Sequence, residues 1–338
     1  MVHRLSTIGF CVVVFISAAG VAHAAKDVVV TTSGDRLVGE IKGVEKDVLT
    51  LSTDYSDADF KIKWDKIASI ESDRQFLVET FDGMRVSGPL KASAPSKAVV
   101  VAEASLPLPE VALVQPFERS FWARFDAALD FGYSLTKTNS AKQLSLSGNL
   151  AYRDERNLDS LFVNVFRSSQ ANATTTERWD LSNDFRHLLG TRWYVNTAQD
   201  LLNSEELGLD LRTTIGGGAG RYLFRSGSQY LALGAGLAWT NEKYTDPALP
   251  SQDSAEAYVG TEFMTEKLKF ADFLTRFSYY PSLTISGRQR ANYRFDLDFN
   301  LPGDWYLRVG FFDNFDSRPP EGFSKNDYGW TNTFGFKF

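Results

Sequence analysis

From about residue 121 to the end of the chain, apolar and polar residues alternate with a period of two, in runs separated by polar turns. The last run shows this pattern most clearly. Its aromatic residues fall on one parity: Tyr328, Trp330, Phe334, Phe336 and Phe338. Its other parity carries mainly glycine, threonine and lysine. Because successive side chains of a strand point to opposite faces, each run predicts a strand with one apolar and one polar face.

About twelve such runs follow one another, which predicts a transmembrane antiparallel β-barrel of about twelve strands. In the run that ends at Leu301, Leu297 falls on the apolar parity, whereas Asp296 and Asp298 fall on the polar one. Alternate connections are short, and the others, such as 241–254, are long and polar. Outer-membrane barrels have short periplasmic turns and longer external loops, so both ends of the barrel are predicted to lie in the periplasm.

The composition hides this membrane signal. Mean hydropathy is −0.23 and 43% of the residues are hydrophobic, values that a soluble protein also shows. Alternation of lipid-facing and lumen-facing residues lowers the average in a barrel, and 14% aromatic residues fit aromatic girdles at the membrane interfaces. A secreted β-sandwich would alternate as well, but it would leave a large apolar area in water. We therefore favour the barrel.

The N-terminus has the features of a secretory signal peptide over residues 1–24. An apolar stretch follows a short positively charged start, and Ala22-His23-Ala24 provides a small-x-small cleavage pattern. Cys11, the only cysteine, lies in this segment, and the bulky Phe10 before it argues against a lipoprotein cleavage site. The mature chain is thus predicted to lack cysteine, which suits an oxidising envelope compartment and excludes thiol chemistry.

Between the signal and the barrel, short predicted strands are broken by glycine and aspartate turns. The segment 33–42 (SGDRLVGEIK) is echoed by the segment 82–91 (DGMRVSGPLK) at a spacing of about 49 residues, which indicates a duplication. Both copies resemble SH3-like or Sm-like small β-barrels, by their strand, Gly turn and strand order and by Trp64-Asp65-Lys66-Ile67 before a closing strand.

The predicted domain order is therefore a signal peptide, two periplasmic modules and an outer-membrane barrel. The first module covers residues 26–73, the second, repeat-like module covers residues 74–118, and the barrel covers residues 119–338. The modules are expected to serve as a spacer or a docking unit, or to bind a peptide or the cell wall. The formal charge of −6 argues against nucleic acid as a partner.

The chain from about Ser120 to Phe338 resembles the family called domain of unknown function 481, whose members are often labelled salt-induced outer-membrane proteins. The glycine-rich strand 207–222 (LGLDLRTTIGGGAGRY), the preceding Arg192-Trp193-Tyr194-Val195 and the aromatic terminus carry this resemblance. It implies a barrel in the outer membrane and no mechanism. The terminus also resembles the signal read by the barrel-assembly machinery, although Thr333 stands where glycine is common. The residues of this signal are Trp330, Phe334, Phe336 and Phe338.

The polar parity of the strands is rich in charges of both signs, which are predicted to point into the lumen. In a narrow barrel they can pair across the lumen, whereas an ion-selective pore usually shows an excess of one sign. A closed, salt-bridged interior is therefore expected. The predicted lumen charges are Arg124, Asp126, Asp130, Arg178, Asp180, Asp184, Arg186, Asp210, Arg212, Glu262, Arg290, Arg294, Asp296, Asp298 and Arg308.

No pattern in the chain indicates catalysis. His187, the only histidine of the mature chain, falls on the apolar parity near a short turn, so we expect an interfacial position for it. The glycine run 216–220 lacks the Lys-Ser/Thr of a phosphate-binding loop and sits in a strand, where small residues allow bending or admit bulky neighbours. We expect no catalytic, cofactor-binding or metal-binding residue, no cofactor, and no enzymatic activity.

The first function hypothesis is an integral outer-membrane protein with a structural or envelope-stress role, whose periplasmic part docks a partner. A passive or small-solute-selective channel is the alternative, and a lipid-modifying enzyme is a less favoured third. Expected partners are outer-membrane lipid, the barrel-assembly machinery, and a periplasmic protein or the cell wall.

Overall fold

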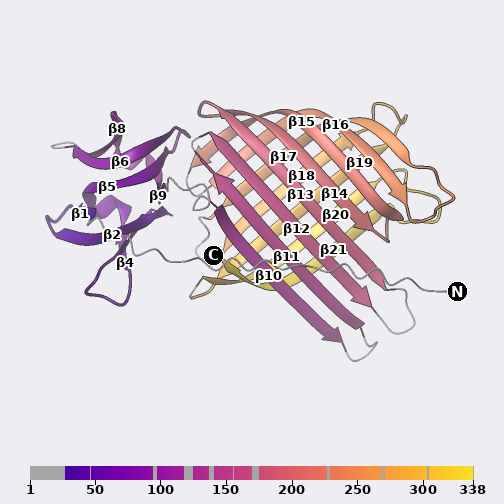
Figure 1. Cartoon of the computed structure of the whole chain (residues 1–338), viewed down its shortest axis with the longest axis horizontal. Helices are drawn as coiled ribbons and strands as arrows, with labels where there is room; N and C mark the ends of the chain where they lie inside the picture. The colour runs from indigo at the N-terminus through magenta and orange to yellow at the C-terminus, as the bar shows by residue number, and fades with distance from the viewer. Residues whose placement is uncertain are drawn as a thin grey trace.

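The protein folds into a small β-sheet module and a closed β-barrel, seen in the computed structural model of Figure 1. Among the described residues, no helix is long and apolar enough to cross a membrane. The predicted signal peptide, Arg124 and Phe338 lie outside the described residues. These are 27–45, 47–93, 97–117, 125–136, 141–154, 156–169, 175–226, 229–266, 268, 271–302 and 304–337.

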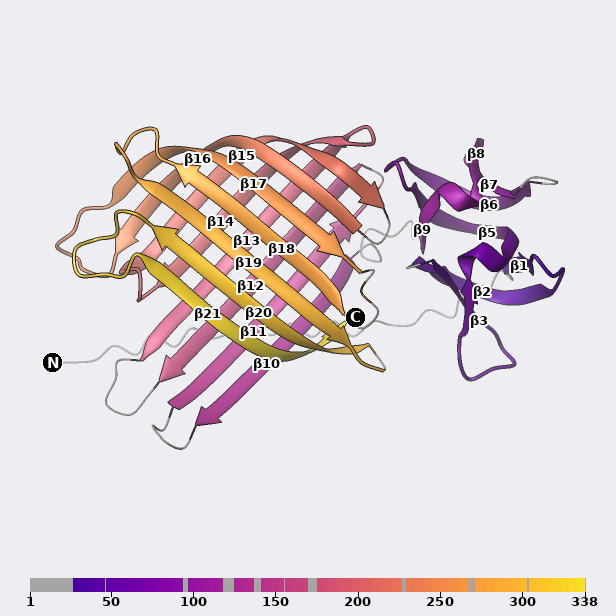
Figure 2. The ribbon, with the colours of Figure 1, turned by 180° about the vertical axis from the view of Figure 1, so that it is seen from behind.

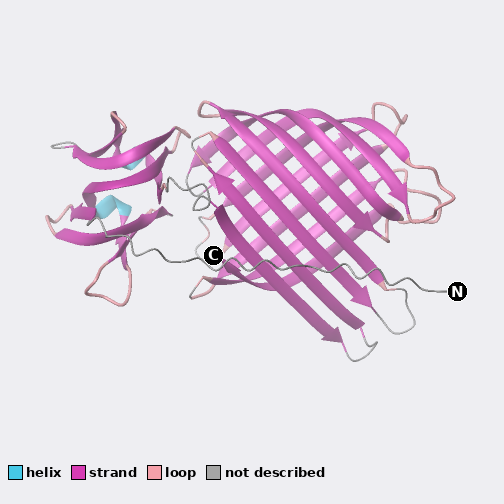
Figure 3. Ribbon diagram, viewed as in Figure 1, coloured by secondary structure: helices cyan, strands magenta, loops and turns pink. Residues whose placement is uncertain are grey.

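The module contains nine strands and two short 3₁₀ turns, which appear in cyan in Figure 3. Its elements are β1 (Asp27–Thr31), β2 (Arg36–Glu45), β3 (Val48–Ser52), β4 (Phe60–Lys63), η1 (Trp64–Lys66), β5 (Ile67–Thr80), β6 (Arg85–Ser93), β7 (Ala98–Val101), β8 (Ala104–Pro107), η2 (Leu108–Glu110) and β9 (Val111–Pro116).

Both halves of the module follow one order: four strands, a 3₁₀ turn and a closing strand. Strand β5 belongs to both halves, because its first part closes β1–β4 and its second part opens β6–β9. All nine strands join in one sheet, in the order β4-β3-β2-β1-β5-β6-β7-β8, with β9 paired to β2 and β5. The predicted division after residue 73 stays a prediction, and it falls inside β5.

One hydrophobic core serves the whole module. Ile41 and Leu49 from the first half and Phe76 and Leu90 from the second are completely buried in a single cluster. The indole Nε1 of Trp64, in η1, donates a hydrogen bond of 2.8 Å to the carbonyl of Leu108, in η2. The two 3₁₀ turns therefore tie the halves together.

The barrel consists of β10 to β21 in sequence order, each antiparallel to its neighbours, and β21 pairs with β10 to close it. The predicted all-β fold with a twelve-stranded transmembrane barrel is thus confirmed. The strands are β10 (Phe125–Thr136), β11 (Ala141–Arg153), β12 (Asn157–Ser169), β13 (Thr176–Leu189), β14 (Trp193–Ser204), β15 (Leu209–Ser226), β16 (Gln229–Tyr244), β17 (Gln252–Thr265), β18 (Asp272–Pro281), β19 (Gln289–Asn300), β20 (Trp305–Asp316) and β21 (Asn326–Lys337).

The strands separate an apolar outside from a polar inside, as the alternation predicts. In β10, Leu129 and Phe131 are 54% and 55% exposed, whereas Asp130 between them is 1% exposed. Aromatic rings of adjacent strands contact one another on the outside, and the ring centres of Phe311 and Trp330 lie 4.9 Å apart. An outer surface of this kind is stable against lipid rather than water.

Inward tyrosines lie over glycines of the next strand. A side chain on Gly220 would overlap the ring of Tyr194, and a side chain on Gly335 would overlap the ring of Tyr306. These glycines make room for large rings inside a narrow barrel, which confirms the interpretation of the glycine run in β15.

Short turns connect the strands at one end of the barrel and longer loops at the other, and we call these the short-turn end and the long-loop end (Figure 2). The module and the C-terminus both lie at the short-turn end (Figure 1).

Replacing Phe76 by alanine should destabilise the module, expressed alone as residues 26–118, by about 3–5 kcal/mol, because this ring is completely buried. Chemical denaturation followed by circular dichroism measures the effect. Tyr55→Ala, at a well exposed position, is the control and should change the unfolding free energy by about 0.5 kcal/mol or less. Equal losses for both variants would contradict the assigned core.

Replacing Leu297 by arginine should impair insertion or stability of the barrel, because an arginine near the midplane of a lipid bilayer costs about 2–4 kcal/mol. Asp298→Asn, on the lumen side of the same strand, should still assemble. Heat-modifiable gel mobility in isolated membranes measures the folded fraction of each variant. Assembly that is lost in Asp298→Asn and kept in Leu297→Arg would mean that the two faces are inverted.

Candidate functional site

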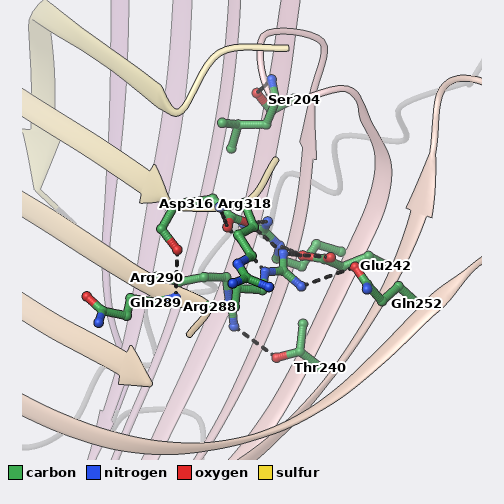
Figure 4. Close-up of polar contacts among 12 residues, drawn as sticks. Ser204, Thr240, Glu242, Gln252, Arg288, Gln289, Arg290, Asp316 and Arg318 are labelled. Atoms are coloured by element: carbon green, nitrogen blue, oxygen red, sulfur yellow. Dashed lines mark hydrogen bonds and ion pairs between the residues drawn. The ribbon is translucent and has the colours of Figure 1, made fainter. Parts of the chain in front are cut away.

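The lumen near the long-loop end is filled by six buried charged side chains, which we call the lid. Figure 4 shows how side chains of neighbouring strands meet there. None of the six is more than 5% exposed. Three are cationic and three are anionic, and the lid consists of Arg212, Glu242, Glu256, Arg288, Arg290 and Asp316.

Two arginines and two carboxylates form the centre of the lid. Arg212 donates from Nε to Glu242 at 2.5 Å and from Nη2 to Asp316 at 3.0 Å. Arg288 donates from Nη2 to both oxygens of Glu242, at 2.7 and 2.8 Å, and to Asp316 at 2.5 Å. Each carboxylate thus bridges both guanidinium groups, so β15, β16, β20 and the β18–β19 loop are held together.

The remaining pair extends the lid to two further strands. Arg290, on β19, donates from Nε to Glu256 of β17 at 2.9 Å and from Nη2 to the hydroxyl of Thr240 at 2.9 Å. Because the charges of the lid balance and are hydrogen-bonded, their burial is tolerated, whereas loss of one partner would leave an unpaired buried charge.

Arg178 of β13 reaches β21 across the lumen and forms an ion pair with Asp327. The hydroxyl of Ser204 on β14 donates to the same carboxylate at 2.8 Å. These contacts lie at the long-loop end beside the lid, so the strands on both sides of the lumen are connected there.

Nearer the short-turn end, Glu262 of β17 is the centre of a second cluster. Arg186 of β13 donates to its two oxygens at 3.0 and 2.9 Å, and Arg276 of β18 donates at 2.6 Å. The hydroxyl of Tyr230 donates at 2.5 Å. Asp184 accepts a further hydrogen bond of 2.5 Å from Arg186. The lumen is therefore bridged by ion pairs at two levels.

The charges beside β10 pair in the same way. Arg308 of β20 donates to Asp130 of β10 at 2.8 Å and to Asp298 of β19 at 2.6 and 2.7 Å. Arg294 donates to Asp296 at 2.9 Å and stacks on Phe162 across the lumen, with its guanidinium carbon 3.7 Å from the ring centre. Salt bridges in the lumen therefore also involve β10, β19 and β20.

A cavity of about 290 Å³ remains inside the barrel. Its lining includes the ion-paired Asp184, Arg186 and Glu262, together with Asp200 and Tyr258. The cavity is large enough for several water molecules or one small solute.

Most predicted lumen charges lie inside and take part in the clusters described above. Asp210 lies instead at an irregularity of the β15–β16 pairing and is exposed at the long-loop end, because the neighbouring Leu209 is buried in its place. Asp126 is exposed near the short-turn end, and Arg124 lies outside the described residues.

Four residues of the lid are not among the lumen charges predicted from the sequence. Glu242, Glu256 and Asp316 lie at strand ends, where polar loops make the alternation hard to follow, and Arg288 lies in the loop before β19. Thr240 and Glu242 share the inward parity of β16, and this pattern could have identified Glu242 as a lumen charge from the sequence. Only the closure of the barrel brings all six side chains of the lid to one place.

The module is attached to the short-turn end through a buried carboxylate, Glu79 of β5, which accepts hydrogen bonds from two arginines. Nε of Arg85, on β6, donates to Glu79 at 2.7 Å. Nε of Arg225, on β15, lies 2.9 Å from the Oε1 atom of Glu79, and Nη2 of Arg225 donates to Oε2 at 3.1 Å. Arg85 also donates to the carbonyl of Asp154, in the β11–β12 turn, at 3.1 Å. We call these contacts the junction.

The arginines of the junction keep Glu79 ionised. Burial alone would raise the pKa of this carboxyl, but Arg225 and Arg85 outweigh that effect and hold the pKa below its ordinary value. Burial lowers the pKa of Arg85 to about 10, with Glu79 opposing the change. The junction is therefore charged at neutral pH.

Among the described residues, no group of histidine, cysteine, aspartate and glutamate side chains is suited to hold a metal ion. The expectation of no metal, no cofactor and no catalytic residue stays a prediction. Trp330 and Phe334 of the predicted assembly signal lie exposed on the outer face of β21, and Phe336 packs against Trp305 with ring centres 4.8 Å apart.

Comparison with known proteins gives one family match. The model of the family described as "Protein of unknown function, DUF481" matches residues 129–338. No curated protein matches the sequence.

Solved structures similar to the barrel include the translocator domain of autotransporter NalP from Neisseria meningitidis, with 12% identity, a TM-score of 0.36, and coverage of 63% of this chain and 87% of that chain. The NanC porin matches with 8% identity, a TM-score of 0.36, and coverage of 63% and 97%. The COG4313 outer membrane channel from Pseudomonas putida F1 matches with 10% identity, a TM-score of 0.36, and coverage of 63% and 95%.

Replacing Glu79 by glutamine should loosen the module from the barrel by about 3–5 kcal/mol, because two buried arginines lose their counter-charge. Hydrogen exchange of the peptides around residues 79–86 and 188–195 measures the docking. Glu71→Gln, on the exposed side of β5, is the matched control.

The same contact predicts a pH dependence. Since the folded pKa of Glu79 is lowered, its contribution is complete above the ordinary glutamate pKa of about 4.3 and is lost as the pH falls through the lowered value. Two results would contradict the role assigned to Glu79: a module that binds the barrel more tightly at acidic pH, or a Glu79→Gln variant whose module binds the barrel as tightly as in the unmodified protein.

Proposed function

The chain belongs to the DUF481 family, and from the architecture of its lumen and junction we propose that it is an integral outer-membrane protein with a structural or envelope-stress role. Its outer-membrane location is supported by the closed ring of strands, which leaves no open sheet edge, and by the exposed apolar outer face. Lipid is then the main partner of the barrel. The outward Trp330 and Phe334 support recognition of β21 by the barrel-assembly machinery.

The lid is the observation that carries a structural role. Charged side chains of β15, β16, β17, β19 and β20 meet inside the long-loop end, and they are neutralised by one another rather than by a passing ion. A pore that conducts at rest needs binding weak enough for an ion to leave, and usually a lining with an excess of one sign. The balanced lid favours a closed barrel.

We propose that the module lies in the periplasm and docks a periplasmic protein or the cell wall there. Its β3–β4 loop projects from one side of the module, downward in Figure 1, and Tyr55 in the loop and Phe60 at the start of β4 have exposed rings whose centres are 6.1 Å apart. The junction holds a different side of the module against the barrel. A partner bound at the loop would therefore be linked mechanically to the membrane.

A gated channel for small solutes is the second candidate, and the cavity inside the barrel favours it. Conduction would require the lid to open. An enzymatic role has less support, and we propose that the barrel is not an enzyme. The ring of His187 lies 2.8 Å from the amide oxygen of Asn157, and among the described residues no serine hydroxyl is bonded to it.

Planar-bilayer recordings test the closed barrel. The purified protein should show no steady conductance. Arg288→Ala removes one of the two guanidinium groups that join Glu242 to Asp316, so the lid is left with excess negative charge that should admit water and give cation-preferring current steps. Arg318→Ala, at an exposed position of the same end, is the matched control and should stay silent.

Steady conductance of the unmodified protein would overturn the structural role and establish the channel. Silence of a correctly folded Arg288→Ala variant, verified by heat-modifiable mobility, would show that the lid is not what closes the lumen.

A further inference from the structure

Two exposed arginines lie on neighbouring segments of the chain at the short-turn end. Arg192 precedes β14, and Arg221 on β15 lies opposite Trp193. Both are exposed, and neither forms an ion pair within the described part of the chain. The backbone amide of Tyr222 donates to the carbonyl of Arg192 at 2.8 Å, which fixes the two segments next to each other.

The rim around these arginines is apolar and faces outward. The inward neighbours Tyr194 and Tyr222 are buried, whereas Trp193 is 54% exposed. The guanidinium carbon of Arg221 lies 5.4 Å from the centre of the Trp193 ring. Further exposed apolar side chains lie at the same ends of β13 and β15, namely Leu189, Leu223 and Phe224.

The module brings a third element to the same rim, the turn between β5 and β6. Gly83 in this turn has φ +91°, and a side chain there would overlap the carbonyl of Thr191, so the two turns are in direct contact. Phe81 and Met84 of the turn are exposed, although they are large apolar residues.

Charge at this turn favours an anionic ligand. Asp82 is the acid of the turn, and its pKa is lowered first by the hydroxyl of Thr80 and more weakly by Arg192. Asp82 accepts a hydrogen bond from that hydroxyl. Arg192 is therefore close to a carboxylate that already accepts a hydrogen bond, and Arg221 adds a second exposed positive charge, so the rim carries a net positive charge.

We propose that this rim binds anionic phospholipid headgroups in the leaflet that faces the short turns, and that the turn 81–84 enters the same interface. Tryptophan is enriched at the headgroup level of membranes, arginine matches phosphate geometry with paired donors, and basic residues next to a membrane attract anionic lipid. The inference rests on the membrane location proposed above. It gives the module a second attachment, through lipid, beside the junction.

Depth measurements with a single label test the position of the turn. Because the mature chain is expected to lack cysteine, Phe81→Cys gives one labelling site in the mature protein. We expect an environment-sensitive dye at this site to shift to the blue in nanodiscs of phosphatidylglycerol and phosphatidylcholine, and to be quenched by headgroup nitroxide lipids. Two positions serve as controls, Leu237→Cys on the outer face of β16 and Tyr55→Cys in the β3–β4 loop. Each of these two native side chains is 64% exposed.

The controls separate the failure of this inference from failure of the membrane location. A quenched Leu237 label with a Phe81 label that behaves like the Tyr55 label would overturn the inference alone. A Leu237 label that is not quenched would overturn the membrane location, and this inference with it.

Lipid selectivity tests the arginines. We expect Arg192→Gln with Arg221→Gln to lower the preference for retained phosphatidylglycerol over phosphatidylcholine by about 25-fold in native mass spectrometry, since each basic residue near an anionic surface contributes roughly fivefold. Arg36→Gln with Arg318→Gln, which removes two exposed arginines outside the short turns of the barrel, should leave the preference unchanged. An unchanged preference in the first pair, or an equal loss in both pairs, would overturn the headgroup site.

Discussion

In lipid, a backbone amide or carbonyl without a hydrogen-bond partner costs several kcal/mol, and the rest of this structure depends on that constraint. The twelve strands satisfy it by closing into a ring, in which β21 returns to β10. Closure places every second side chain of each strand in a narrow lumen. The inward half of the barrel must therefore satisfy its own polar groups, and balanced charges are the solution found here.

The paired charges connect strands on different sides of the lumen. Arg186 and Glu262 lie on strands separated by three others, yet they form a two-fold hydrogen-bonded pair. The lid repeats this arrangement at the long-loop end. Separating two buried charges costs free energy, because each is left without its counter-charge in the barrel interior. Local opening of the barrel is therefore opposed at two levels.

The junction and the lumen are in physical contact through aromatic rings. Arg225, which pairs with Glu79, stacks on Tyr222 with its guanidinium carbon 4.8 Å from the ring centre, and Tyr222 meets Tyr230 edge-on at 5.7 Å. The hydroxyl of Tyr230 in turn donates to Glu262. The module is thus joined to the central ion pairs of the barrel by a continuous series of contacts rather than by its linker alone.

Local alternation is a property of the sequence, because the side-chain period of a strand is two whatever its partners are. The fold class, the strand order, the two faces and inward charges such as Asp130 and Arg308 could therefore be predicted from residues alone. The pairing of Glu79 with Arg225 and the meeting of Arg288 with Glu242 could not. These contacts join residues far apart in the chain, and only closure of the barrel and docking of the module bring them together.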